Sequence, residues 1–149
     1  MNPVVENMPV LYRHRGKWEG TYRFVDTSNQ LLDQYDFRIH CEFPDEPEVA
    51  YRQTSEYFWN DGRTQELCFE AQYQDGRVVW DNGRIAGKLW ELDDETVYLT
   101  FGFHDDPDVH VTEMIQISPC GEHRGRTWHW FRRARLFQLT LVEERRCEG

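Results

Sequence analysis

Glu113 is the residue whose position most directly suggests chemistry. It interrupts an otherwise apolar alternation, with Val111 and Ile115 on either side of it. A carboxylate on an apolar face is costly unless it is paired or protonated, so burial raises its pKa. A carboxyl group with a raised pKa can serve as a general acid or base. Two alternatives stay open: a register change that turns Thr112 and Met114 inward, or a structural ion pair between Glu113 and an arginine.

A second group of polar side chains follows one predicted strand. Alternate positions place hydroxyl and amide groups on a single face, at Tyr51, Gln53, Ser55 and Tyr57. Such groups fix the orientation of a ligand between aromatic walls, and Tyr57 joins Glu113 as a candidate for proton transfer. The alternative is that each tyrosine only buries its ring and directs its hydroxyl to water or backbone.

The run TWHWF over 127–131 supports two opposite interpretations. If Trp128 and Trp130 face inward, His129 points outward. If the strand sits the other way, Thr127 and His129 face the ligand, and His129 becomes a third candidate for proton transfer. The sequence leaves both open.

Other chemistries find little support. The run HDDPDVH over 104–110 contains metal-ligand residue types, but Pro107 within an acidic stretch indicates a solvated hairpin loop. The sequence contains no nucleophile elbow, phosphate-binding loop, dinucleotide fingerprint or zinc helix motif, which argues against hydrolase, kinase and nicotinamide chemistry. We therefore predict no metal and no cofactor.

The elements that position these residues follow from a hydrophobic period of two, which dominates after residue 16 and is typical of strands with one dry face. Turn signals such as Asn60-Asp61-Gly62 and Asp75-Gly76 separate short segments. The strands that we predict cover 17–25, 35–43, 49–59, 64–73, 77–81, 84–92, 96–104, 109–118, 125–132 and 135–144.

Many short strands without helices must hide their edges. We predict an all-β fold, a closed antiparallel up-and-down barrel of about eight to ten strands, with a two-sheet sandwich as the alternative. A barrel of this size encloses one small ligand. The chain forms a single domain over 1–149, in which 1–15 is an arm or a short helix.

The segment Gly16-Lys17-Trp18-Glu19-Gly20 resembles the G-x-W signature that opens the first strand of lipocalins and related calycin barrels. Together with the C-terminal run RLFQLTLVEERR, it looks most like bacterial lipocalin-like domains of the DUF3598 kind. The resemblance implies that Trp18 closes one end of the barrel and that an arginine of the last strand packs across it, here Arg145 or Arg135. No haem-ligating histidine can be placed as the nitrobindin branch would require.

Composition limits the classes of binding partner and the cellular location that we expect. The net charge of −10 argues against nucleic acid and against anionic membranes. The four cysteines form no C-x-x-C pair and no secretory signal is visible, which favours a reduced cytoplasmic protein; a homodimer stays open.

Three functions fit this sequence. The first is binding of a small apolar or aromatic metabolite inside the barrel. The second is a cofactor-independent lyase, isomerase or cyclase that acts by acid/base chemistry there, and the third is a filled structural or partner-binding barrel. The predicted catalytic residues are Glu113, Tyr57 and His129. The predicted ligand contacts are Tyr22, Phe37, Tyr51, Gln53, Ser55, Phe69, Phe101, Trp128 and Trp130.

Overall fold

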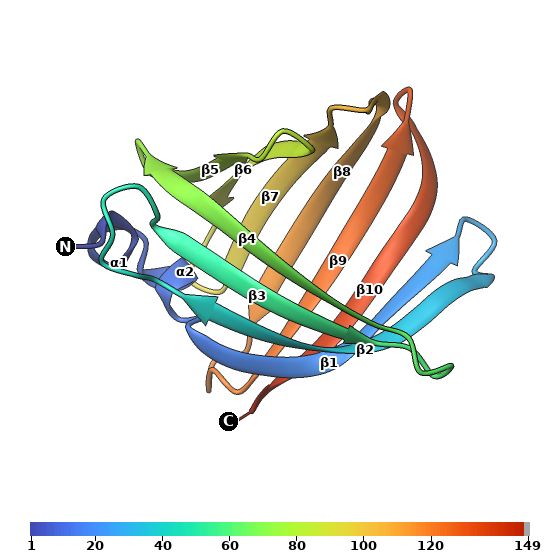
Figure 1. Ribbon diagram of the computed structural model, residues 1–149, viewed down its shortest axis with the longest axis horizontal. Coiled ribbons are helices and arrows are strands. Elements are labelled where there is room, and N and C mark those ends of the chain that lie inside the picture. The colour runs from blue at the N-terminus through green and yellow to red at the C-terminus, as the bar shows by residue number, and fades with distance from the viewer. Residues whose placement is uncertain (148–149) are drawn as a thin grey trace.

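The computed structural model describes residues 1–147, which form two short helices followed by ten strands (Figure 1). The helices are α1 (Pro3–Asn7) and α2 (Pro9–Tyr12). The strands are β1 (Gly16–Asp26), β2 (Leu31–Glu42), β3 (Tyr51–Phe58), β4 (Thr64–Gln74), β5 (Arg77–Asp81), β6 (Ile85–Glu91), β7 (Thr96–Phe103), β8 (Asp106–Ile117), β9 (His123–Arg132) and β10 (Arg135–Cys147).

The strands close into one antiparallel up-and-down barrel. Each strand pairs with its neighbours in sequence, and β10 returns to pair with β1. Among residues 1–147 this closure leaves no strand with an unpaired edge, as expected for many short strands without covering helices. The predicted all-β barrel is confirmed, and the sandwich is excluded.

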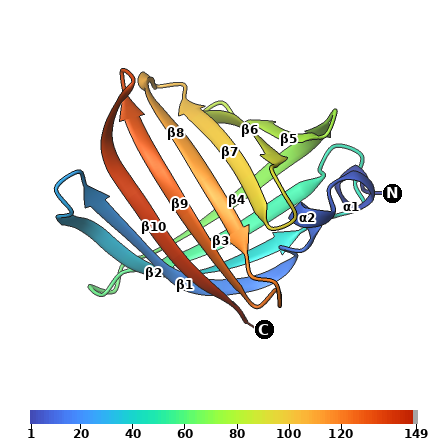
Figure 2. The same cartoon turned by 180° about the vertical axis from the view of Figure 1, so that it is seen from behind.

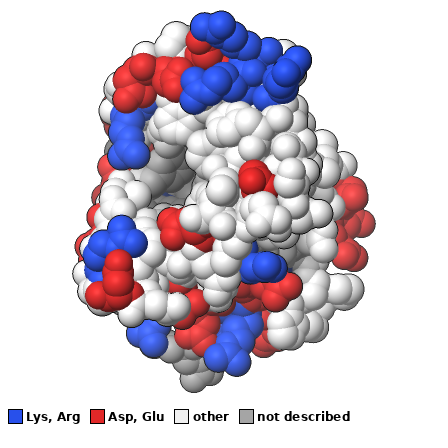
Figure 3. Space-filling model, turned by 90° about the vertical axis from the view of Figure 1, so that its right-hand side faces the viewer, with Lys and Arg blue, Asp and Glu red and all other residues white. Residues whose placement is uncertain are grey.

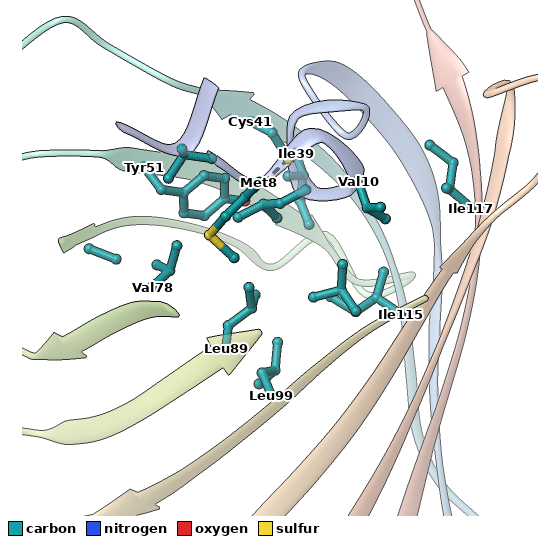
Figure 4. Packing of buried hydrophobic residues seen from close by; sticks show 14 of the residues in the cluster. Met8, Val10, Ile39, Cys41, Tyr51, Val78, Leu89, Leu99, Ile115 and Ile117 are labelled. Atoms are coloured by element: carbon teal, nitrogen blue, oxygen red, sulfur yellow. Dashed lines mark hydrogen bonds between the residues drawn. The ribbon is translucent and has the colours of Figure 1, made fainter. Parts of the chain in front are cut away.

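The N-terminal segment closes one end of the barrel. Asn2 caps α1 by accepting a 2.8 Å hydrogen bond from the Val4 backbone N–H, and its amide donates to the carbonyls of Pro44 and Ala50 in the loop between β2 and β3. Met8 is fully buried and points from the helices into the barrel interior (Figure 4). The predicted arm is therefore a pair of short helices that acts as a lid.

Gly20 allows β1 and β10 to approach each other closely. A Cβ atom at this position would lie 1.9 Å from the backbone carbonyl oxygen of Glu143 on β10. Only glycine permits this spacing without backbone movement. The G-x-W-x-G sequence thus serves both the plug at Trp18 and the closure of the barrel.

The opposite end of the barrel carries the tight hairpins that join β1 to β2, β3 to β4, β5 to β6, β7 to β8 and β9 to β10 (Figures 1 and 2). The two helices of the described residues lie at the other end, and Figure 3 shows a hollow here whose walls carry few charged side chains. No helix within residues 1–147 is long and apolar enough to cross a membrane.

Candidate functional site

The inner wall of the barrel gathers the residues that we predicted to contact a ligand. Strand alternation puts all nine of them on the inward face, where they are buried or partly buried. Trp128 and Trp130 face inward and stack on each other with ring centroids 5.8 Å apart. The structure therefore selects one of the two interpretations of the TWHWF run.

The outward position of the His129 side chain follows from the same alternation. Its backbone pairs with Thr112 and Leu139, which also face outward, and its ring stacks on Phe131. The structure does not bring His129 to the interior, because β9 can present only one parity to the barrel. Of the three candidates for proton transfer, Glu113 and Tyr57 remain inside.

A buried ionic cluster crosses the middle of the barrel. Arg124 makes a bidentate contact with Glu144, at 2.7 and 2.8 Å, and Arg126 donates to the same carboxylate at 3.0 Å. Glu113 approaches Arg126 at 3.5 Å, the longest contact of the cluster. All four side chains are at most 6% exposed, so their charges interact in a medium of low polarity.

The pKa values in this cluster diverge. Burial raises the pKa of Glu113 to about 7; Arg126 opposes this rise, and Glu144 adds to it. Burial also disfavours ionised Glu144, but the two arginines lower its pKa below the ordinary value. One carboxylate is therefore held ionised while the other titrates near neutrality, which is the division that acid/base chemistry requires. The ion pair between Glu113 and an arginine, which the sequence left open as an alternative, is present as the 3.5 Å contact with Arg126.

Tyr22 completes this cluster. Its hydroxyl oxygen accepts a 2.7 Å hydrogen bond from Arg126, and within residues 1–147 no acceptor takes its hydrogen. Burial raises the pKa of Tyr22 well above the ordinary value, against the opposing charge of Arg126. The hydroxyl is thus a neutral donor available inside the barrel.

Two indole N–H groups are also buried inside the barrel without a partner among the described residues: those of Trp80 and Trp128. A weak hydrogen bond from Trp128 favours the ionised form of Glu113, but among the described residues no acceptor lies within full hydrogen-bonding distance of the Trp128 N–H. Phe101 connects the two indoles. Its ring contacts the Trp128 ring, and its Cβ atom and the Trp80 ring both pack against the backbone of Gly87. Unpaired buried donors are rare and need an explanation.

The hydroxyl and amide groups of β3 largely satisfy one another. The Tyr51 hydroxyl donates to the side-chain carbonyl of Gln53 at 2.7 Å, and the Gln53 amide donates to the Ser55 hydroxyl at 3.2 Å. The buried thiol of Cys41 lies 3.3 Å from the Tyr51 hydroxyl. This chain of contacts orients the three side chains, and Gln53 remains partly exposed to the interior.

The open end leads into a pocket of about 390 Å³. Its walls include the aromatic rings of Phe24, Tyr35, Tyr57 and Trp59, and its lining also contains the charged side chains of Asp33 and Arg84. Tyr57 contacts the rings of Tyr22 and Tyr35, so the aromatic wall continues from the pocket to the ionic cluster.

Trp18 plugs the closed end, as predicted. It is fully buried, its indole N–H donates to the His14 carbonyl at 2.9 Å, and guanidinium groups lie over its ring at 4.7 Å for Arg124 and 4.4 Å for Arg146. The predicted choice of Arg145 or Arg135 was wrong. Arg145 faces outward and pairs with Glu19, because only even-numbered residues of this part of β10 point inward.

Comparison with known proteins addresses the fold. No protein-family model and no curated protein matches the sequence. Among solved structures, a DUF3598-family protein of unknown function from Nostoc punctiforme aligns with a TM-score of 0.68 at 16% identity, covering 92% of this chain and 49% of that protein. This chain thus spans about half the length of that relative.

Two further solved structures align with this chain over nearly the whole length of both proteins. The S-type phycobiliprotein lyase CPES from Guillardia theta has a TM-score of 0.66 at 14% identity, with 97% of this chain and 93% of that chain covered. The protein Rv2717c from M. tuberculosis has a TM-score of 0.66 at 12% identity, with 95% and 98% covered. The chain has a lipocalin-like barrel fold. The resemblance to DUF3598 proteins is confirmed at the level of fold.

Sequence reasoning missed the arginines of the lipocalin-like barrel's interior and their carboxylate. The signal was present, since Arg124, Arg126, Trp128 and Trp130 share one parity. Glu144 likewise shares its parity with the buried Val142. Among residues 1–147 no group of three or more His, Cys, Asp or Glu side chains could hold a metal ion. In the HDDPDVH run, His104 instead contacts Asp81 at 2.8 Å.

Proposed function

We propose that this chain binds a small aromatic molecule inside its barrel, and that the molecule presents hydrogen-bond acceptor atoms to the wall. The observation that carries this proposal is the surplus of buried donors, namely the indole N–H groups of Trp80 and Trp128 and the hydroxyl of Tyr22. Each unpaired donor costs about 1–3 kcal/mol. A ligand with carbonyl or acidic oxygens would repay that cost on binding.

The surrounding surface supports an aromatic skeleton for such a ligand. Inward-facing rings line the route from the open end to the cluster, and many of them remain partly exposed although they point into the barrel. Ligand sites typically combine apolar walls with a few convergent polar groups. A barrel filled for structural reasons alone would bury these rings completely.

A matched pair of fluorescent probes tests this proposal. Phenylnaphthylamine is uncharged, whereas anilinonaphthalenesulfonate has the same aromatic rings and adds acceptor oxygens. We expect saturable binding of both by the isolated full chain. Replacing both Trp80→Phe and Trp128→Phe keeps two aromatic rings and removes both N–H donors. The sulfonate should then bind about tenfold more weakly, the worth of one charge-assisted hydrogen bond, and the amine within about twofold of wild type.

Trp90→Phe is the matched control, because Trp90 lies on the outer face of β6 against Tyr98. It should leave both affinities unchanged. Binding of neither probe would contradict the proposal, and so would an equal loss for both probes in the double variant.

Proton transfer is a second candidate, favoured by the pKa of Glu113 near 7 beside the Tyr22 hydroxyl and Arg126. The fold does not decide between binding and catalysis. A protein of the same fold is named as a phycobiliprotein lyase, so the barrel is compatible with a lyase, isomerase or cyclase. On this view Glu113 moves the proton and Arg126 stabilises the charge that develops on the substrate.

Nitrobenzisoxazole is a simple probe for such a base. A carboxylate removes the ring C–H proton, the electron pair forms the nitrile, and the N–O bond breaks to release a phenolate. We expect turnover that rises with pH around a midpoint near 7 and is lost in Glu113→Gln. Turnover that is unchanged in this variant would exclude Glu113 as the base.

We also propose a reducing, cytoplasmic location. All four cysteines are free thiols, and two of them, Cys68 and Cys120, are exposed. Exposed thiols persist where disulfide formation is suppressed. Thiol titration of protein isolated from its native cells should find all four reduced.

A further inference from the structure

The outer wall of the barrel is divided by charge. On β1 to β4 most outward rows carry acids or bases, for example Arg38 opposite Glu56 and Glu56 opposite Glu66. On β7 to β10 the pattern changes. One row across these strands contains Tyr98, Met114, Thr127 and Leu141, none of them charged at neutral pH.

The neighbouring rows on β7 to β10 are similar. The next contains Thr100, Thr112, His129 and Leu139, and the one beyond pairs His110 with Phe131. We call the outward residues of these three rows the uncharged face; Figure 2 shows its four strands side by side. Charged residues make up 30% of the chain, so a surface of this extent without any of them is not expected from composition.

Charged residues border the uncharged face. Lys88 lies beside it on β6, Arg23 beside it on β1, Asp108 at the end near the hairpins, and Glu143 at the other end. Within it, Met114 is 42% exposed and Leu141 37% exposed. An apolar centre with a charged border is the usual anatomy of a protein interface.

We propose that two copies of this chain associate through the uncharged face about a two-fold axis. Each copy carries a net charge of −10, so contact through the charged wall would bring acidic side chains together, and contact here avoids this. An uncharged surface offers nothing to recognise a charged partner but is complementary to itself. A two-fold axis near Thr127 exchanges the outer strands and places Tyr98 of one copy against Leu139 and Leu141 of the other.

The size of the uncharged face fits this assignment. Neighbouring strands lie about 4.8 Å apart and outward residues about 6.7 Å apart along a strand, so four strands and three rows cover roughly 400 Å². A stable interface buries about 800 Å² on each partner. The uncharged face therefore supplies the central half, and the bordering charges supply the polar rim. This proposal does not depend on the ligand or on catalysis.

The test is the mass of the full chain in solution over a range of concentrations, by light scattering and sedimentation. We expect wild type to have twice the 18.0 kDa mass of one chain. Thr127→Glu sets two like charges near the axis and should raise the dissociation constant at least tenfold. Thr54→Glu is the matched control, an outward threonine in the middle of β3, and should remain dimeric.

Circular dichroism should show that each variant keeps its strands. Should Thr127→Glu fail to fold, Leu141→Arg makes the same test at a position already partly exposed. A wild-type chain that stays monomeric up to millimolar concentration would overturn the proposal. So would a dimer that folded Thr127→Glu or Leu141→Arg leaves intact, because the copies would then meet elsewhere.

Discussion

The pKa of Glu113 predicts how folding stability depends on pH. Burial raises this pKa from the ordinary value of 4.5 to about 7, so the folded state holds a proton that the unfolded state releases. Stability is unpenalised below pH 4.5, falls between about 4.5 and 7, and levels off above. At about 1.4 kcal/mol per pKa unit, ionised Glu113 costs the folded state about 3 kcal/mol.

Glu113→Gln isolates this cost, because glutamine keeps the shape and does not titrate. Arg126 keeps its bonds to Glu144 and Tyr22 in the variant. We expect the free energy of unfolding of the variant, relative to wild type, to increase by about 2.5 kcal/mol between pH 5 and pH 8, since part of the total cost is already present at pH 5. Other titrating groups are common to both proteins and cancel in this difference.

Urea denaturation of wild type and Glu113→Gln at several pH values between 5 and 8 measures this difference in the free energy of unfolding. Glu143→Gln, an exposed carboxylate on the outer face of β10, is the control and should show no such trend. A difference that stays constant with pH would mean that Glu113 has an ordinary pKa. A difference that favours wild type as pH rises would mean that the contact with Arg126 outweighs burial. Either result would remove the reason to place acid/base chemistry in the barrel.

Three further substitutions test residues that hold the barrel together. Trp18→Ala should lower the free energy of unfolding by about 4 kcal/mol in urea denaturation, since it empties the closed end between two guanidinium groups; a loss below 1 kcal/mol would contradict the plug. Gly20→Ala should leave little folded protein by circular dichroism, because its Cβ overlaps the Glu143 carbonyl. Ala134→Gly should raise the free energy of unfolding by about 1 kcal/mol, because Ala134 has a φ of 65°; a lower thermal midpoint would contradict this strain.

The strands and their inward faces were predictable from sequence because a period of two survives in almost every segment. The turn between β9 and β10 shows where this reasoning ends. Arg133 and Ala134 both adopt positive φ, yet neither belongs to the residues that usually mark such turns. Barrel closure imposes that conformation from outside the local sequence. The same holds for the arginine that packs on Trp18, which we predicted as Arg145 or Arg135 and which is Arg146, because the parity of the last strand opposite Trp18 decides it.

The candidate site was predictable only in part. Glu113 could be singled out because it stands alone among apolar neighbours on its own strand. Its partners could not, because Arg126, Glu144 and Tyr22 come from three other strands. A pattern along one strand predicts that a charged side chain faces inward, but the register between strands determines which side chains it contacts. The unpaired N–H groups of Trp80 and Trp128 were beyond sequence for the same reason.

The ionic cluster bears on whether the barrel interior is purely structural. A buried ion pair seldom stabilises a protein more than well-packed apolar residues of the same volume. Arg124 and Glu144 form a bidentate pair whose remaining contacts are made by Arg126 and His14, and a structural role accounts for them. Glu113 is different, because its hydrogen bond from Arg126 is long at 3.5 Å and its pKa lies near neutrality, so in its present surroundings the cost of burial outweighs its pairing. A group retained at such cost beside unpaired donors is explained by a ligand that uses them, and a filled barrel offers no comparable explanation.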